Sequence, residues 1–341
     1  MTERDWRLPE HRRELFQRFY SFHLEYRAHP GCVYFMLPAL ADTYDLDADG
    51  RAWLVWLNGN TQNPVMSELL LQIAPTWQEW RKATDFVSDN FKLMDWDTDR
   101  RYFKAKFGQA TEQWAENVVL SPAEDWLAAG AQGWDRTWGY ALSQPYMGRL
   151  SAWSMTEYAR ILLGKCVPDA ATLMLEDKSG SRSHRNGLGL LAGYDATYWG
   201  PEGAEVLGIV DGLRGLGEDL LSEAQSRNPG HPDVSYLTLE STLCTYKSFH
   251  KPDRRYPGVY LDMHYDRIVK AEQRFGWRFD TQWGARRGLP RQLARELDES
   301  NPGLSRVKQN AYRETGRVLY LGAHWPDMRY YDHTNLKEMY L

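Results

Sequence analysis

Apolar residues recur every three to four positions along most of the chain, and this spacing predicts amphipathic helices. Pro9 begins the first of them, which continues to about Arg27 and carries Leu15, Phe19 and Phe22 on adjoining turns. Helix-start signals follow at Asn63-Pro64, Pro75, Ser121–Glu124 and Ser154–Glu157, the last two as capping boxes. Later helices are expected near residues 203–227, 233–249, 262–275, 290–299 and 303–315.

Alternation typical of strands is scarce. Val33–Leu40 and Trp53–Leu57 are the runs that suit short strands, and each suits a buried helix segment equally well. The sequence therefore predicts a mainly α, multi-helical protein. No internal repeat or flexible linker is present, and the candidate domain boundary is near Gly130–Gly133. We expect one helical domain over residues 1–341, with lobes of about 1–130 and 131–341.

Charge bears on the kind of partner. The net charge is −5, so general attraction to anionic polymers is not expected. Residues 247–295, however, hold 12 Lys/Arg against 5 Asp/Glu. This local excess fits a phosphate backbone and equally fits solvated helices. If the partner is a nucleic acid, the residues expected to contact its phosphate backbone are Arg254, Arg255, Arg286 and Arg287.

Cysteine use and hydropathy indicate the compartment. The three cysteines, at positions 32, 166 and 244, have neither a disulfide framework nor metal-ligand spacing. No stretch approaches the length of a membrane span, and the N-terminus lacks the apolar centre of a signal peptide. We therefore expect a cytoplasmic protein without membrane contact.

Several familiar motifs fail. Asp45–Gly50 begins like a calcium loop, but Trp56 occupies the position of the bidentate Glu. Gly164-Lys165-Cys166 lacks the rest of a phosphate-binding Walker loop. No dinucleotide-binding, zinc-protease or zinc-deaminase motif is present. We expect no metal site and no required cofactor. Mg²⁺ could still accompany a bound pyrophosphate group without dedicated protein ligands.

Glu240, Cys244 and Lys247 are the strongest candidates for chemistry. On a helix they lie on one face, so that an acid or base, a soft nucleophile and a cation converge. A solvated ion pair beside a buried cysteine is the structural alternative.

The basic segment Lys178–Gly187 suits phosphate or pyrophosphate. If it is a loop, Gly180 and Gly187 let backbone amides approach a ligand closely. A plain surface loop is the alternative. The side chains expected to bind pyrophosphate are Lys178, Ser181, Arg182 and Arg185.

An amide-rich segment at residues 58–64 offers groups that both donate and accept hydrogen bonds. Such groups can read a base edge or bind an amino acid, and they also form turns and caps. The candidates for base or amino-acid binding are Asn60, Gln62 and Asn63, and Asn63 also suits a helix cap.

Together, these three segments resemble the bacteriophage amino acid:DNA transferases, also called α-glutamyl/putrescinyl thymine pyrophosphorylases. The match runs in order over about residues 50–270: Trp56–Asn63, the segment ending in Asn186-Gly187-Leu188, and Glu240-x₃-Cys244-x₂-Lys247. That family is related to DNA glycosylases and to a helical domain associated with 5-hydroxymethyluracil DNA kinases. The resemblance implies a glycosylase-like bundle of two lobes around a central cleft.

The resemblance also implies a reaction. An amino acid or amine replaces pyrophosphate on the 5-methylene of pyrophosphorylated 5-hydroxymethyluracil in DNA. The amine is a small amino acid, with glycine as one candidate, or a polyamine. Cys244 would be the nucleophile, Lys247 would lower its thiol pKa, and Glu240 would accept the amine's proton. The alternatives are a glycosylase-like hydrolase that removes a modified base and a non-catalytic phage DNA-binding module.

Overall fold

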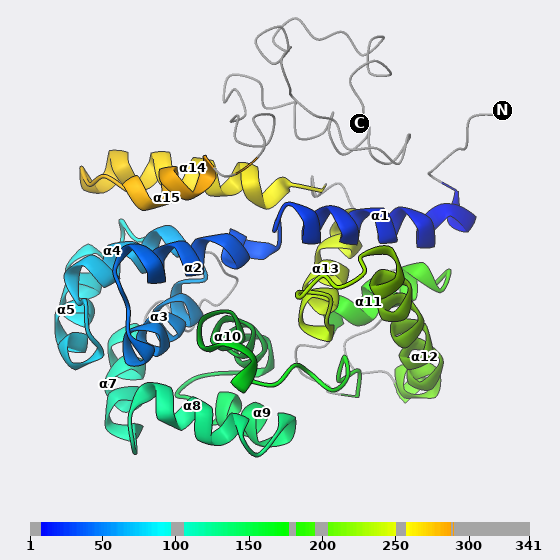
Figure 1. Cartoon of the computed structure of the whole chain (residues 1–341), viewed down its shortest axis with the longest axis horizontal. Coiled ribbons are helices and arrows are strands. Elements are labelled where there is room, and N and C mark those ends of the chain that lie inside the picture. Colours follow the sequence, from blue (N-terminus) through cyan, green and yellow to red (C-terminus); the bar gives the residue numbers. More distant parts are fainter. Residues whose placement is uncertain are drawn as a thin grey trace, which may run out of the picture. The chain divides into compact units, whose positions relative to one another are not determined.

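The computed structural model describes residues 8–96, 106–176, 182–194, 204–249, 257–287 and 289. Over these residues the chain is helical, with no strand, which confirms the mainly α, multi-helical prediction (Figure 1). Val33–Leu40 and Trp53–Leu57 both lie in helices, because each is an apolar run long enough to be buried on several sides. None of the described helices combines the length and apolar character needed to cross a membrane.

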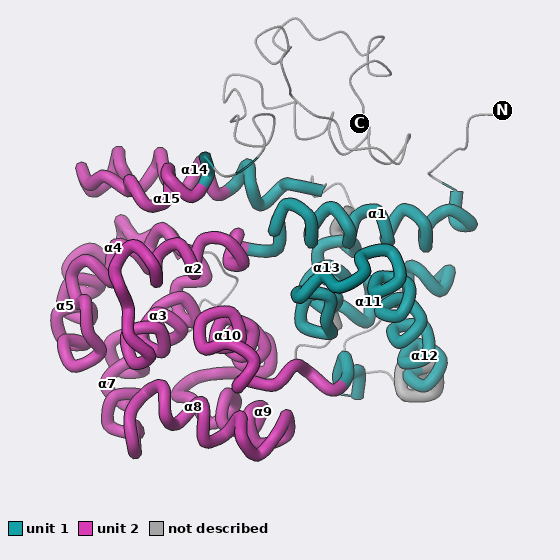
Figure 2. Tube along the Cα trace, viewed as in Figure 1, with its two compact units in different colours: residues 1–30, 172–263, 286–341 teal, residues 31–171, 264–285 magenta. Residues whose placement is uncertain are grey.

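The chain forms two compact units that are interleaved in sequence (Figure 2). Unit 1 comprises residues 1–30, 172–263 and 286–341, and unit 2 comprises residues 31–171 and 264–285. The expected boundary near residue 130 therefore falls inside unit 2. The division follows tertiary contacts between distant segments, which local sequence patterns do not reveal.

Unit 1 is built around a core of apolar side chains from four helices and the segment before α11. Leu15 and Phe19 of α1 and Leu243 and Tyr246 of α13 are all fully or almost fully buried. The Tyr246 ring meets Phe16 and Phe19 edge-on, with ring centroids 5.2 and 5.7 Å apart. The helices are α1 (Arg12–Glu25), α11 (Arg182–Leu191), α12 (Ala204–Arg227) and α13 (Tyr236–Phe249).

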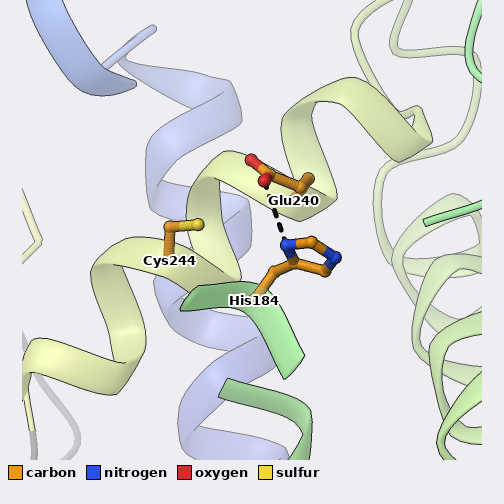
Figure 3. Close-up of side chains that lie close together, drawn as sticks. All are labelled: His184, Glu240 and Cys244. Atoms are coloured by element: carbon orange, nitrogen blue, oxygen red, sulfur yellow. Dashed lines mark ion pairs between the residues drawn. The ribbon is translucent and has the colours of Figure 1, made fainter. Parts of the chain in front are cut away.

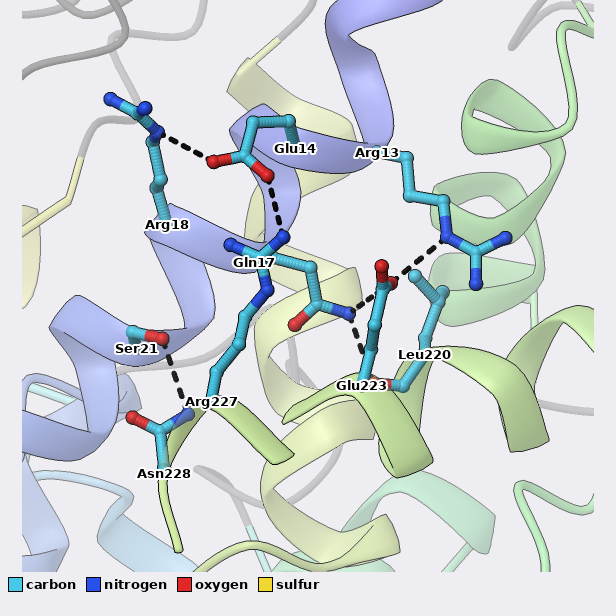
Figure 4. A network of polar contacts seen from close by, with 9 residues as sticks. All are labelled: Arg13, Glu14, Gln17, Arg18, Ser21, Leu220, Glu223, Arg227 and Asn228. Carbon is cyan, nitrogen blue, oxygen red and sulfur yellow. Dashed lines mark hydrogen bonds and ion pairs between the residues drawn. The ribbon is translucent and has the colours of Figure 1, made fainter. Parts of the chain in front are cut away.

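Polar contacts fix α1 against α12 in unit 1 (Figure 4). The buried Gln17 amide donates to the Leu220 carbonyl at 3.0 Å and to Glu223 Oε2 at 3.1 Å. Arg13 Nε also meets Glu223 Oε2, at 2.9 Å. These contacts set the register of the two helices over the apolar core.

Unit 2 contains most of the shorter helices. Trp114 stacks with both Trp53 and Trp56, at 5.3 and 5.0 Å between ring centroids. Gly59 of α3 lies against Met155 of α10, where a Cβ would come within 2.7 Å of Met155 Cγ. The helices are α2 (Val33–Thr43), α3 (Ala48–Thr61), α4 (Pro64–Ile73), α5 (Trp80–Asn90), α7 (Phe107–Asn117), α8 (Pro122–Gly130), α9 (Trp134–Ser143) and α10 (Arg149–Leu163).

Helix α14 (Val259–Phe275) begins in unit 1 and continues in unit 2, and α15 (Asp280–Arg286) follows it. Short 3₁₀ turns complete the described elements. They are η1 (Pro9–His11), η2 (Pro30–Cys32), η3 (Trp77–Glu79) and η4 (Gly164–Cys166).

Two of the predicted helix starts are confirmed by their caps. Asn63 Oδ1 accepts from the Val65 amide at 3.2 Å, and Ser121 Oγ accepts from the Glu124 amide at 3.3 Å. The predicted start at Ser154 is wrong, since Ser154 lies inside α10 and its hydroxyl donates back to the Leu150 carbonyl at 3.1 Å.

The predicted helices at 203–227, 233–249 and 262–275 correspond to α12, α13 and α14. Those at 290–299 and 303–315 lie outside the described residues.

Candidate functional site

The candidate site is built on two helices of unit 1 whose backbones approach closely. A Cβ on Gly187 of α11 would lie 2.6 Å from the backbone oxygen of Leu243 on α13. Real side chains do not tolerate such a distance, so only glycine permits this approach. Gly187 was expected to help a loop bind a ligand. The structure instead places it in a helix, where it lets α11 lie directly against α13.

This packing brings His184 of α11 next to Glu240 and Cys244 of α13 (Figure 3). His184 Nδ1 lies 3.0 Å from Glu240 Oε1. The histidine nitrogen, a glutamate oxygen and the cysteine sulfur all lie within 4.8 Å of one another. Glu240 and Cys244 thus share a helix face, as their spacing predicted.

Burial differs across this cluster. His184 is fully buried and Glu240 is 2% exposed, while Cys244 is half-buried. In this low-dielectric setting a charge on Glu240 or His184 is costly unless a shared proton or another positive species compensates it. The cysteine is the member of the cluster that solvent reaches most easily.

The second nitrogen of His184 fixes the orientation of the ring. Nε2 lies 3.0 Å from the backbone oxygen of Leu173. A carbonyl oxygen only accepts hydrogen bonds, so Nε2 carries a proton and donates it. Nδ1 is consequently the atom that faces Glu240 and Cys244.

Lys247 lies one turn beyond Cys244 and reaches α11, where its ammonium donates to the hydroxyl of Ser183. The predicted face of α13 therefore packs against α11. Lys247 contacts Ser183 of that helix, and Glu240 contacts His184. The assigned catalytic roles of the three residues remain predictions.

The basic segment differs from the expected loop, because α11 begins at Arg182. Arg185 is 7% exposed and donates to the Leu175 carbonyl at 3.0 Å. This contact ties α11 to the segment before it. Lys178, Ser181 and the Arg182 side chain lie outside the described residues.

The amide-rich segment belongs to unit 2, and its amides have structural partners there. Asn60 is 1% exposed and donates to the Trp56 carbonyl at 2.8 Å. Asn63 caps α4 and also donates to the Asp95 carbonyl at 2.8 Å. Gln62 ends α3 in the left-handed conformation and donates to Ser154 Oγ at 3.2 Å. Their predicted role in base or amino-acid binding stays a prediction.

The four arginines expected at the DNA backbone have different positions. Arg286 is 2% exposed and donates to the Leu261 carbonyl at 2.8 Å, which is a structural contact. Arg287 is exposed, so its guanidinium is accessible to a phosphate. Arg254 and Arg255 lie outside the described residues.

Sequence reasoning did not single out His184. It appeared as one basic residue among several in the expected loop, and its partners are on another helix. The signal that could have found it is the triplet His184, Gly187 and Leu188. If the segment is helical, glycine marks a close contact one turn after the histidine and leucine marks the core side.

Comparison with known proteins gives one informative similarity. The chain is 26% identical, over 374 aligned positions, to a protein named serinyltransferase from Salmonella phage ViI. The alignment covers 98% of this chain and 88% of that protein. No protein-family model and no solved structure matches the chain.

Proposed function

We propose that this protein is a transferase that attaches an amino acid to a modified thymine base in DNA. The similarity to the phage serinyltransferase over nearly the whole chain carries this proposal. The buried pair of His184 and Glu240 beside Cys244 supports it, because the cluster supplies a base and a nucleophile close together.

The acceptor is pyrophosphorylated 5-hydroxymethyluracil in DNA. The amine nitrogen forms a bond to the 5-methylene carbon while the bond from that carbon to the pyrophosphate oxygen breaks. Pyrophosphate leaves with the electron pair. The ammonium group of the amino acid gives up one proton before the attack, which frees the nitrogen lone pair that forms the new bond. Glu240 is suited to accept a proton, since its carboxylate lies beside His184 in a buried setting.

Two routes use these residues differently. In the covalent route, the Cys244 thiolate adds to C6, pyrophosphate leaves from the methylene, and the amine adds to the exocyclic methylene. The thiolate is then expelled from C6. In the dissociative route, pyrophosphate leaves without covalent attack by the thiol. Fixed positive charge near the leaving group helps both routes, and Lys247 and Arg182 are the candidates for that charge.

The substrate base leaves the helix stack to react, at a cost of a few kcal/mol. The DNA backbone then needs local positive charge, because the protein carries a net charge of −5. Among the predicted backbone contacts that the structure describes, Arg287 has an exposed side chain and can supply this positive charge.

The test uses DNA that contains pyrophosphorylated 5-hydroxymethyluracil and a mixture of isotope-labelled amino acids. After digestion to nucleosides, mass spectrometry identifies the attached amino acid. We expect labelled nucleoside and an equal amount of released pyrophosphate. Free modified base would instead support the hydrolase, and binding without a product would support the DNA-binding module. Either result would overturn the proposal.

Matched variants separate the residue roles. Glu240→Gln is expected to lower the transfer rate by about 10²–10⁴-fold, the usual contribution of a general base. Glu112→Gln, at an exposed position in unit 2, should leave the rate unchanged. Cys244→Ala should abolish transfer if the reaction follows the covalent route, whereas transfer should persist on the dissociative route. Cys166→Ala changes an exposed cysteine and serves as the control, which should leave the rate unchanged.

A further inference from the structure

The histidine, glutamate and cysteine at the candidate site are residue types that bind metal ions, a property that the transfer reaction as proposed above does not use. Their three donor atoms lie within 4.8 Å of one another on α11 and α13 (Figure 3). The geometry points to a binding site for one zinc-type divalent metal ion, held by His184 Nδ1, a Glu240 oxygen and Cys244 Sγ.

The orientation of His184 is the first support. Because Nε2 donates to the Leu173 carbonyl, a neutral ring presents the lone pair of Nδ1 toward Glu240 Oε1, 3.0 Å away. A lone pair and a carboxylate oxygen repel unless a positive species is shared between them. Metal-bound histidines typically donate the second ring N–H to a backbone carbonyl or a carboxylate, which is the arrangement seen here.

The separations between donor atoms are the second support. Zinc binds nitrogen and oxygen ligands at about 2.0–2.2 Å and sulfur at about 2.3 Å. Two nitrogen or oxygen ligands of one tetrahedral ion therefore lie about 3.3–3.6 Å apart. His184 Nδ1 and Glu240 Oε1, at 3.0 Å, need to separate by only a few tenths of an ångström to reach this distance. The sulfur is near enough to close on the same ion with a small side-chain adjustment.

The chemistry of the donors decides the class of ion. A thiolate and an imidazole favour zinc and related transition metals, whereas Mg²⁺ and Ca²⁺ prefer oxygen ligands throughout. The sequence indicated no such site because its cysteines lack metal-ligand spacing. The ligands come from separate helices, brought together by the contact of Gly187 with Leu243.

Three protein ligands leave one position of a tetrahedral ion open, as in catalytic zinc sites. The half-buried Cys244 marks the accessible side of the cluster. Resting on the proposed function, we assign the open position to an oxygen of the leaving pyrophosphate. Cys244 is then a ligand, so the reaction follows the dissociative route, and the second oxygen of Glu240 remains for the amine's proton.

The experiment uses untagged full-length protein, stripped with a chelator and then given one equivalent of Zn²⁺ or Co²⁺. Metal retained after gel filtration is measured by elemental analysis. The Co²⁺ form is examined for thiolate-to-cobalt charge-transfer absorption. We expect about one ion per chain and a clear charge-transfer band.

Variants identify the ligands. Cys244→Ser should remove the charge-transfer band, and His184→Gln should weaken binding by at least about tenfold. Cys166→Ala should change neither result. Circular dichroism checks that each variant is folded, and the metal content of the unmodified protein answers the question even where a variant does not fold.

The inference is overturned if the unmodified protein retains no Zn²⁺ or Co²⁺, which would mean that a proton alone joins His184 to Glu240. A charge-transfer band that persists in Cys244→Ser would overturn it as well. Transfer by fully metal-free protein would refute the metal's catalytic role while leaving the proposed function intact. Metal binding without any transfer would overturn the proposed function while leaving the metal site intact.

Discussion

At the scale of single residues, two histidines in unit 1 lie in the interior, where burial disfavours the charged form of the imidazole ring. His23 and His29 are both almost completely buried, with ring centroids 5.4 Å apart. Burial lowers the pKa of His23 to about 3. Burial also holds the pKa of His29 well below its usual value, with smaller contributions from His23 and His231.

These pKa shifts predict a loss of stability in mild acid. The unfolded chain binds a proton on His23 below about pH 6.5, whereas the folded protein does so only near pH 3. The stabilising contribution is therefore complete above pH 6.5 and declines as the pH falls toward 3. Between pH 7 and pH 5, His23 alone should lower the free energy of unfolding by about 2 kcal/mol.

The check is urea unfolding of the unmodified protein and of His23→Leu at both pH values. Leucine is similar in volume and does not titrate, so the variant should lose about 2 kcal/mol less on acidification. Equal losses in the two proteins would show that His23 is already protonated, or is accessible, in the folded state.

Residue spacing accounts for part of the site. Glu240 and Cys244 are four positions apart, and a helix with that spacing places them together whatever surrounds it. His184 could not be assigned in the same way, because its place beside Glu240 depends on the packing of one helix on another. Asn60 shows the opposite limit of prediction from sequence. Its side-chain amide could bind a ligand, but in the structure it donates to a carbonyl of its own helix.

At the scale of helices, caps were predictable and helix interiors were less so. Asn63 and Ser121 each stand before a proline at the first helical position, and this combination specifies a start locally. Ser154 precedes a glutamate with the same spacing, yet α10 already begins at Arg149. A capping pattern without a break before it does not separate a start from a helix interior.

The contact between α11 and α13 gives a prediction at this scale. In Gly187→Ala, the new Cβ would lie 2.6 Å from the Leu243 backbone oxygen, and a helix backbone cannot move away easily. We expect the free energy of unfolding to fall by about 1–3 kcal/mol, which is typical of overpacking. We also expect activity and metal binding to fall by more than the loss of folded protein explains. The helices must separate, which moves His184 away from Glu240.

Gly215→Ala is the matched control. Gly215 is an exposed position inside α12, and a Cβ there meets nothing within 4 Å. Alanine favours a helix more than glycine does, so this variant should be more stable by up to about 1 kcal/mol. Thermal unfolding of both variants checks the pair. A Gly187→Ala protein as stable and active as the original would disprove the close approach.

At the scale of the whole molecule, the two units differ in their response to acid. Unit 1 holds the buried His23 and His29, so it loses stability as the pH falls. In unit 2, burial raises the pKa of Glu68, so the folded state takes up a proton more readily than the unfolded chain does. That carboxyl group favours the folded unit increasingly as the pH falls through its pKa.

The tryptophans allow the units to be followed separately. Of the 15 tryptophans, 12 lie in unit 2, while Trp6, Trp199 and Trp325 belong to the ranges of unit 1. Tryptophan emission therefore reports mainly on unit 2, whereas circular dichroism reports helices of both units. At pH 5 we expect ellipticity to fall at lower urea concentrations than those at which emission shifts to longer wavelength, because unit 1 opens first.

At pH 8 the histidines are neutral in both the folded and unfolded states, so the gap between the two transitions should narrow. In His23→Leu the gap at pH 5 should narrow as well, which ties the early transition to unit 1 rather than to acid in general. Coincident transitions at both pH values would mean that the units unfold as one cooperative body. The acid sensitivity of the buried histidines would then be a property of the whole chain, because loss of either unit would carry the other with it.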